Sequence, residues 1–340
     1  MKKIKTAIVG MGVVGKRRKY FIEKNNNYKI IAVSDINFKK DIKKNNIYYY
    51  KDYKNILNLD LDCIFVTLPN YLAPKVTSLF LKKNISVFCE KPPGRNIDDI
   101  KKIIKIERNC KAKLMYGFNH RYHGSVVQAK NIIEKKTLGE ILNIRGLYGK
   151  SKIVSYNKGV WRSKKRFAGG GILLDQGIHM LDMINYFCGP FTNFKSFISN
   201  SHWKYDIEDD VFAIFKNSKG ILASIHSTAV QWEHKFRIEI SLQKGSIELN
   251  GILSGTKSYG SESLTILKVK SNKFKNKITK KTIYFKKDNS WKKEIEEFKR
   301  ILISNNKKGV IKGTSKEALE VMRMIDSIYK NDKKIIKKKY

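Results

Sequence analysis

The chain contains few residues of several types that would indicate special folds. Its 340 residues include 5 prolines, 4 cysteines and only 30 acidic residues against 70 basic ones. No stretch reaches the roughly 18 uninterrupted apolar residues that a membrane span requires, so we expect no membrane association. The cysteines show no C-x-x-C pair and no metal-ligand spacing, which predicts reduced thiols, no metal site and a cytoplasmic protein; they are Cys63, Cys89, Cys110 and Cys188.

The first residues, MKKIKTAIVG, place lysines before an apolar run as a signal peptide does. That run is only a few residues long and ends in a glycine-rich turn instead of a small-residue cleavage site. We therefore interpret it as the first strand of the fold.

The excess of basic residues gives a formal net charge of +40, which invites a nucleic-acid interpretation because lysine and arginine neutralise phosphates. The lysines, however, recur in nearly every surface-like segment together with abundant Ile and Asn, and no known base-reading motif is present. Codon bias in an AT-rich genome explains all three enrichments at once. We favour that explanation over an electrostatic role and expect no nucleic-acid partner.

The order of apolar runs predicts two different folds in succession. In the first 118 residues strand-like runs alternate with helical patterns, as in a doubly wound parallel sheet. The expected strands are Lys5–Val9, Ile30–Ser34, Ile47–Tyr50, Cys63–Leu68, Ser86–Cys89 and Lys113–Gly117, and the expected helices are Val13–Glu23, Pro74–Lys83 and Ile97–Arg108.

After residue 118 the pattern predicts an α+β domain with an open, mostly antiparallel sheet, because hairpins follow one another at glycine-containing turns. The expected strands there are Ile141–Leu147, Val211–Phe215, Ile221–Thr228, Arg237–Leu242 and Ser246–Leu249. The expected helices are Ser125–Lys135, Ile172–Phe187, Trp291–Ile303 and Ser315–Tyr329.

A glycine motif follows the first predicted strand and opens the first predicted helix; it reads Gly10-Met11-Gly12-Val13-Val14-Gly15. Asp35 ends the second strand, in the layout of a dinucleotide-binding fold. Gly10 permits the tight turn, Gly12 lets the pyrophosphate approach, and Gly15 lets the helix pack closely. A purely structural glycine turn is the alternative.

The acid after the second strand bears on the choice of cofactor. Asp35 can accept hydrogen bonds from ribose hydroxyls and repels a 2′-phosphate, which favours NAD over NADP. Lys39 and Lys40 lie close enough in sequence to weaken this preference. Arg17 and Arg18 in the first helix can assist phosphate binding.

Two further strand ends carry candidate cofactor contacts, since ligands of open α/β sheets bind beyond the carboxyl ends of the strands. The segment Val66–Asn70 supplies Thr67, Pro69 and Asn70, and the segment Val87–Gly94 supplies Glu90 and Lys91. A partly desolvated ammonium at Lys91 can hydrogen-bond the reacting oxygen. The peptide bond from Lys91 to Pro92 can be cis, and the alternative for Lys91 is a solvated surface lysine.

The segment GGGILLDQGIHMLD at 169–182 carries the expected proton chemistry. Three glycines let the chain approach a substrate or cofactor and turn into a helix. Asp175 and His179 are four residues apart and so share a helical face. His179 is the expected general base, because an ordinary imidazole exchanges protons near neutrality. Asp175 can orient it or hold a substrate hydroxyl, whereas Asp182 is expected to be structural.

Taken together, these motifs resemble the glucose-fructose oxidoreductase and inositol dehydrogenase family of NAD(P)-dependent oxidoreductases. The resemblance spans nearly the whole chain, through GMGVVG, TLPN, EKP, GFNHRYHG at 117–124 and GGGILLDQGIHMLD. It implies a Rossmann domain over 1–118, a substrate-binding and oligomerisation domain over 119–340, and catalytic roles for Lys91, Asp175 and His179. One departure is Ala73, where the family often has a histidine; it bears on the placement of the nicotinamide.

The same resemblance extends to the substrate. The segments around GFNHRYHG and WRSKKRFAGGG look most like the branch that acts on sugars or nucleotide sugars for surface polysaccharide synthesis. Candidate substrate contacts are Asn119, Arg121, Tyr122, Trp161 and Arg162, each of which also has a structural explanation. Inositol or polyol dehydrogenation, and a non-catalytic regulator that senses the dinucleotide, remain as alternatives. The resemblance also implies a homodimer or homotetramer.

Overall fold

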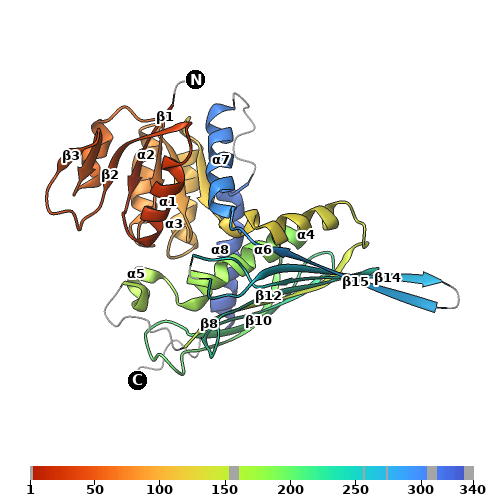
Figure 1. The fold of residues 1–340 in the computed structure, drawn as a ribbon. Helices are drawn as coiled ribbons and strands as arrows, with labels where there is room; N and C mark the ends of the chain where they lie inside the picture. Colours follow the sequence, from red (N-terminus) through yellow and green to blue (C-terminus); the bar gives the residue numbers. More distant parts are fainter. Residues whose placement is uncertain (1–2, 153–160, 256, 273–274, 305–311, 333–340) are drawn as a thin grey trace. The chain divides into compact units, whose positions relative to one another are not determined.

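The computed structural model describes residues 3–152, 161–255, 257–272, 275–304 and 312–332. The chain divides into two compact units, residues 1–118 with 291–319, and residues 119–290 with 320–340 (Figure 1). The break after Phe118 coincides with the expected one. Residues 291–319 differ, because they group with the N-terminal unit although they follow the whole second sheet in sequence.

The N-terminal unit is built on a seven-stranded sheet with the order β3-β4-β2-β1-β5-β6-β7. All neighbouring pairs are parallel except β3 with β4. The order reverses between β1 and β5, which is where open α/β sheets bind their ligands. The strands are β1 Ile4–Val9, β2 Tyr28–Ser34, β3 Ile42–Lys44, β4 Ile47–Tyr50, β5 Cys63–Val66, β6 Ser86–Glu90 and β7 Leu114–Gly117.

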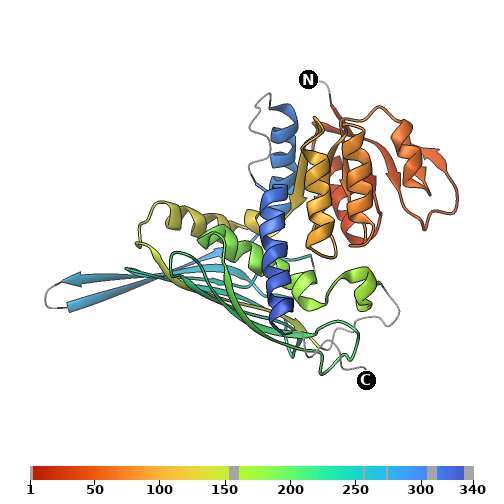
Figure 2. The ribbon, with the colours of Figure 1, turned by 180° about the vertical axis from the view of Figure 1, so that it is seen from behind.

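Helices cover both faces of this sheet, because right-handed crossovers in opposite directions from β1 and β5 place them on opposite sides (Figures 1 and 2). The helices are α1 Val13–Glu23, α2 Ala73–Lys82, α3 Ile97–Glu107 and α7 Ser290–Ile303, with a 3-10 turn, η1, over Tyr53–Asn58. The α7 helix packs on the sheet through Phe298, whose ring lies 5.5 Å from both Phe65 and Phe88. This contact explains why a late helix completes the early domain.

The C-terminal unit contains an eight-stranded sheet with the order β15-β14-β13-β12-β8-β11-β10-β9. Only β8 with β11 is parallel, so the sheet is mostly antiparallel as expected. The strands are β8 Ile141–Ser151, β9 Asn193–Ser199, β10 Asp210–Lys216, β11 Leu222–Gln231, β12 Lys235–Leu242, β13 Gly245–Asn250, β14 Glu262–Asn272 and β15 Lys275–Phe285.

Helices pack on one face of this second sheet, which we call the inner face (Figures 1 and 2). They are α4 Gly124–Glu134, α6 Ile178–Cys188 and α8 Ser315–Asn331; η2 Asn119–Tyr122, η3 Trp161–Ser163 and α5 Lys165–Ala168 are short turns. Gly146 of β8 allows α6 to pack closely on the sheet, since a Cβ there would lie 2.3 Å from the sulfur of Met180.

Four strands were not expected from the sequence: β3, β9, β14 and β15. The β14 and β15 strands form a long hairpin in register from Glu262–Phe285 to Asn272–Lys275. Its lysine-rich second strand resembles a solvated loop in composition. Pairing along the whole length of β14 makes it a strand.

Candidate active site

The three motif glycines occupy three different environments. Gly10 has φ +97°, and a Cβ there would lie 2.6 Å from the carbonyl oxygen of Thr67. At Gly15 a Cβ would lie 1.9 Å from the carbonyl oxygen of Gly10, whereas at Gly12 nothing lies within 4 Å. These environments agree with a tight turn at Gly10, open approach at Gly12 and close helix packing at Gly15. The loop therefore fits a dinucleotide pyrophosphate.

Asp35 lies directly beside this loop. Its Oδ2 accepts a hydrogen bond from the backbone N–H of Met11 at 2.6 Å, and its Oδ1 accepts from the backbone N–H of Asn37 at 2.9 Å. The carboxylate is thus held at the end of β2, where the ribose of a dinucleotide binds. Val13, 82% exposed, and the half-buried Val14 begin α1 next to it.

The turn after β5 supports the loop from behind. The hydroxyl of Thr67 donates to the carbonyl oxygen of Gly10 at 2.6 Å. The carbonyl of Pro69 accepts the N–H of Ala73 at 3.0 Å and so begins α2, while Asn70 is buried. Ala73, the departure from the family pattern, is itself buried as the first residue of that helix.

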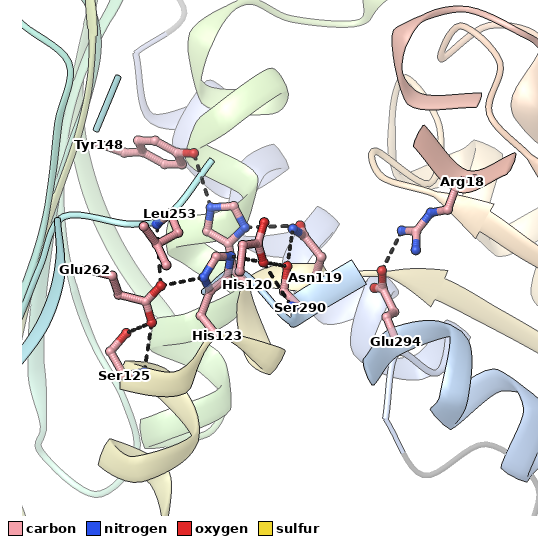
Figure 3. Close-up of polar contacts among 11 residues, drawn as sticks. Arg18, Asn119, His120, His123, Ser125, Tyr148, Leu253, Glu262, Ser290 and Glu294 are labelled. Carbon is pink, nitrogen blue, oxygen red and sulfur yellow. Dashed lines mark hydrogen bonds and ion pairs between the residues drawn. The ribbon is translucent and has the colours of Figure 1, made fainter. Parts of the chain in front are cut away.

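Lys91 follows the end of β6, is half-buried, and precedes a cis bond to Pro92. Its neighbour Glu90 is fixed by Arg18, whose Nε donates to the Glu90 carboxylate at 2.6 Å. The Nη2 of Arg18 pairs with the buried Glu294 at 2.5 Å, as Figure 3 shows. Burial opposes the charge of Arg18, but Glu294 and Glu90 outweigh it and raise its pKa.

The interpretation of Arg18 as a phosphate ligand is therefore wrong. Its side chain is fully buried, stacked between the rings of Phe88 and Trp291 at 4.4 and 4.3 Å. Instead of binding phosphate, Arg18 holds the carboxylate that precedes Lys91 in the chain.

The helix expected over Ile172–Phe187 begins differently. Leu173–Gly177 forms a π-helical turn, η4, and α6 continues from Ile178. Asp175 lies in the π turn and is half-buried, and His179 is the second residue of α6 and is 5% exposed. Single π turns are rare and frequently occur at functional sites.

The glycines before this turn make close contacts within the chain. A Cβ at Gly170 would lie 2.0 Å from the hydroxyl of Tyr329, and one at Gly171 would lie 2.0 Å from the carbonyl oxygen of Glu208. The Glu208 carboxylate accepts the N–H of Gly171 at 2.8 Å and of Leu173 at 3.1 Å, and the Tyr329 hydroxyl at 2.8 Å. Packing against these groups, and not approach to a substrate or cofactor, is the structural requirement that we observe at Gly170 and Gly171.

Two residues near His179 were missed in the sequence. His120 stacks on it, with ring centroids 3.7 Å apart and planes at 15°. The hydroxyl of Tyr148 lies 3.2 Å from Nε2 of His120 (Figure 3). Tyr148 is on the inner face of β8, and a polar side chain at an inward-facing strand position was the signal that could have identified it.

Lys150 is two residues further along the same face of β8, and it too was missed. Burial lowers the pKa of its ammonium, the nearby Asp175 partly offsets this, and Arg162 adds to the lowering. Lys150 therefore lies near one carboxylate, that of Asp175, and one further cation, that of Arg162. Burial, and to a smaller extent the charge of Lys150, also lowers the pKa of His234.

Two of the expected substrate contacts lie in the core. Arg121 makes a two-pronged ion pair with Asp182, with distances of 2.8 Å from Nε and 2.5 Å from Nη2. Its side chain is 1% exposed and that of Asp182 is fully buried. Tyr122 is also buried. The structure therefore contradicts direct substrate contact for Arg121 and gives Asp182 the structural role expected of it.

The other expected substrate residues lie elsewhere in the same unit. Asn119 is half-buried, and its amide contacts Ser290 and His120. Trp161 and Arg162 form the 3-10 turn η3, in which the exposed guanidinium lies 4.5 Å above the indole ring. An exposed cation on an aromatic ring is a suitable surface for a polar ligand.

Among the residues of the described ranges, no group of three or more His, Cys, Asp or Glu side chains could hold a metal ion. No helix in the same ranges is long and apolar enough to cross a membrane. Burial raises the pKa of Cys63, Cys89 and Cys188 to about 12, so these thiols are poor nucleophiles.

Comparison with known proteins agrees with this architecture. Residues 4–118 match the model of an oxidoreductase family with an NAD-binding Rossmann fold, and residues 126–248 match the GFO/IDH/MocA C-terminal domain. The chain is similar to levoglucosan dehydrogenase of Pseudarthrobacter phenanthrenivorans, with 25% identity over 228 residues, or 58% of each chain. It is also similar to a putative oxidoreductase subunit of UDP-kanosamine synthase from Amycolatopsis mediterranei, with 25% identity over 66% of this chain and 68% of the other.

The solved structure of levoglucosan dehydrogenase with NADH superposes with a TM-score of 0.81 at 19% identity, covering 97% of each chain, which supports the fold. The sequence match to the curated levoglucosan dehydrogenase, in contrast, spans just over half the length of that relative. Both domain models belong to one family and together they match the greater part of the sequence. The chain therefore belongs to the GFO/IDH/MocA family, with an NAD-binding Rossmann domain at its N-terminus.

Proposed function

We propose that the protein is an NAD-dependent oxidoreductase that transfers hydride between nicotinamide and a ring carbinol carbon of a sugar or nucleotide sugar. The observation that carries this proposal is the Asp175–His179 pair, set by a π turn and packed against buried polar side chains. The glycine loop with its bonded Asp35 supports dinucleotide binding, and Lys91 follows the end of a strand in the same sheet.

In this proposal bound NAD supplies the hydride acceptor. The imidazole of His179 takes the hydroxyl proton as the carbonyl forms, and Asp175 orients the imidazole or holds a neighbouring hydroxyl. The ammonium of Lys91 hydrogen-bonds the reacting oxygen and stabilises the charge that develops on it. When the reaction runs in the opposite direction, as reduction of the carbonyl, His179 returns the proton to the oxygen.

The catalytic assignment is tested with Lys91→Ala and His179→Ala. Each should lower kcat by roughly two orders of magnitude or more, as for groups that act mainly in the transition state. NAD affinity, titrated separately by fluorescence, should stay within a few-fold of wild type. His202→Ala, which removes an exposed histidine, is the matched control. Near wild-type turnover of His179→Ala would move the general base elsewhere.

NAD is proposed over NADP because Asp35 would face the 2′-phosphate. The carboxylate is held by the Met11 N–H, so it cannot swing away without losing that bond. Titration of both cofactors should give tighter binding of NAD(H), and Asp35→Asn should narrow the difference. Tighter binding of NADP(H) by the wild type would show that Lys39, Lys40 or Arg17 outweighs the acid.

The finer proposal is a nucleotide sugar, in surface polysaccharide biosynthesis. Its support is the pair of cations Lys150 and Arg162, of which Lys150 also lies near Asp175, together with the similarity to a subunit named for UDP-kanosamine synthesis. Arg162→Ala should raise KM for a nucleotide sugar far more than for the free sugar. Arg323→Ala, another exposed arginine, is the control. Equal effects on both substrates, or activity only with a neutral polyol such as inositol, would discard the nucleotide-sugar assignment.

A regulator that binds the dinucleotide without turnover is the second class of function. It is distinguished by incubating the protein with NAD and a panel of sugars and polyols: a regulator binds NAD and reduces none. The proposed catalytic set is intact, with Lys91, Asp175 and His179 all present, which favours the enzyme.

We further propose a cytoplasmic homodimer or homotetramer that associates through the outer face of the eight-stranded sheet. Four apolar side chains there are 52–77% exposed: Phe197, Phe212, Ile214 and Leu222. Strand register makes them neighbours, since Phe212 pairs with Phe197, and Ile214 pairs with Ser224, two residues from Leu222 on the same face of β11. Phe212→Lys should lower the mass measured by light scattering. An unchanged mass would exclude this face.

A further inference from the structure

His120 is a buried titratable residue that the proposed mechanism does not use. It lies on η2, and its ring covers that of His179 at 3.7 Å with planes at 15°. The two imidazoles are 7% and 5% exposed, so water screens them little. Two parallel rings at this separation hold each other's planes in place, and a proton on one opposes a proton on the other.

The contacts of His120 determine its tautomer. Ser290 donates its hydroxyl hydrogen to Asp288 at 2.6 Å, so its oxygen accepts from the Asn119 Nδ2 at 3.4 Å. The amide oxygen of Asn119 therefore faces Nδ1 of His120, at 3.2 Å (Figure 3). Because this oxygen can only accept, Nδ1 of His120 carries a hydrogen.

The other nitrogen can exist in two states without losing its partner. Nε2 lies 3.2 Å from the hydroxyl of Tyr148, and burial raises the pKa of that phenol well above its usual value, so it keeps its proton. Neutral His120 accepts this proton in a hydrogen bond. Protonated His120 instead donates to the phenol oxygen, and the Tyr148 hydroxyl turns its own hydrogen away from the imidazole.

The Tyr148 ring lies beside that of Tyr259, with centroids 5.2 Å apart, and the Tyr259 hydroxyl donates to the amide oxygen of Gln176 at 2.6 Å. A proton on His120 keeps its contacts to Asn119 and Tyr148. The stacked His179 ring opposes that proton when it is itself charged.

We propose that His120 is a positioning residue for His179. The stacked pair binds its protons in two coupled steps, so that near neutrality at most one of the two rings is charged. This inference rests on the general-base role proposed for His179. Neutral His120 then presents an aromatic face to the imidazolium that His179 becomes when it takes the hydroxyl proton, and the fixed ring plane keeps that proton transfer aligned.

Other titratable groups within this unit surround the pair and belong to the same balance. His123, which lies between η2 and α4, has its ring centroid 5.5 Å from that of His120 and pairs with Glu262 at 2.8 Å and Asp288 at 4.0 Å. From β8 come Tyr148 and Lys150, from the segment before β14 comes Tyr259, and from the π turn comes Asp175. These groups are present in every variant used below, so they do not account for differences between variants.

The coupling is measured by NMR titration of histidine labelled with carbon-13, in wild type, His120→Phe and His179→Asn. Coupling predicts two well separated steps for the pair in wild type, and in each variant the loss of the more acidic step. The remaining ring should titrate about one pH unit or more above that lost step. A remaining ring that keeps its wild-type titration in both variants would overturn the proposal. This readout needs no substrate.

The positioning role is measured by kinetics of two substitutions that differ in stacking. His120→Phe keeps an aromatic ring and should retain kcat within about threefold, whereas His120→Ala removes it and should lower kcat roughly tenfold with little change in NAD affinity. Circular dichroism verifies folding, and His202→Ala is again the control. Equal losses in both variants would overturn the role of the stack. If none of the sugars and polyols tested supports NAD reduction by the wild type, the proposed function fails. The NMR titration still decides whether the two rings are coupled.

Discussion

The glycine loop offers a sharp test, because replacement of two of its glycines by alanine should have opposite consequences. At Gly12 a methyl group would enter open space, and the backbone there, at φ −67° and ψ −165°, is one that alanine adopts without strain. The fold should therefore keep its stability. At Gly15 the new Cβ would lie 1.9 Å from the carbonyl oxygen of Gly10, whereas ordinary contact begins near 3.4 Å.

The magnitudes follow from these distances. A conflict of about 1.5 Å with rigid backbone at Gly15 must move α1 or the loop, which for overpacking costs about 1–3 kcal/mol and lowers Tm by roughly 2–10 °C. Gly12→Ala should leave Tm within about 1 °C but weaken NAD(H) binding by about tenfold or more, or about 1.4 kcal/mol, because its methyl fills the space the pyrophosphate needs.

The assay pairs thermal unfolding without cofactor with fluorescence titration of NADH for wild type and both variants. Gly189→Ala is a poor control because of its positive φ, so Ser218→Ala, at an exposed turn position outside the loop, serves instead. Wild-type affinity in Gly12→Ala would refute the assignment of Gly12 to the pyrophosphate. An unchanged Tm in Gly15→Ala would refute the packing argument.

Three further predictions concern buried carboxylates. Burial opposes ionisation of Glu262, but hydrogen bonds from His123 and Ser125 outweigh burial and lower the pKa of the carboxyl. The ionised carboxylate therefore stabilises the fold above the unfolded-state pKa of about 4.3, and this stabilisation is lost as the pH falls through the folded-state pKa. Urea unfolding should show that Glu262→Gln is less stable than wild type at pH 7 and that the difference in unfolding free energy shrinks below about pH 4. Arg18→Met should destabilise by about 3–5 kcal/mol in denaturant unfolding, because it leaves the carboxylate of Glu294 buried without its cation; a smaller loss in Arg18→Met/Glu294→Leu would confirm that cause. Tyr329→Phe removes one donor from buried Glu208 and should cost about 1–2 kcal/mol by the same measurement.

The parts of this protein that could be predicted from its sequence are those that depend on the spacing of residues close together in the chain. The glycine loop with Asp35, the parallel strands with their crossovers, and the four-residue separation of Asp175 and His179 all follow from neighbouring residues in the chain. The helix Val13–Glu23 and the strand Ile47–Tyr50 form with the bounds expected of them. Periodicity carries this information because each residue's face in a helix or strand is a local property.

Other features could not be predicted, since they depend on partners far away in sequence. Arg18 looks like one more cation in a basic helix, and only the arrival of α7 with Glu294, 276 residues later, makes it a buried ion pair. The β15 strand reads as a lysine-rich loop until β14 pairs with it. Likewise, nothing near His120 in the sequence indicates that its ring lies on His179.

The sequence by itself thus determined the class of fold, the dinucleotide loop and the candidate catalytic residues, because those signals consist of spacing along a chain. Tertiary structure alone decided which polar residues are buried with partners and which surround His179. Arg121, predicted as a substrate contact, is a buried ion-pair partner of Asp182 in the structure, and His120 and Tyr148 lie beside His179. The reason is physical: hydrogen bonds, ion pairs and ring stacking act over a few ångströms of space, whatever number of residues separates the groups along the chain.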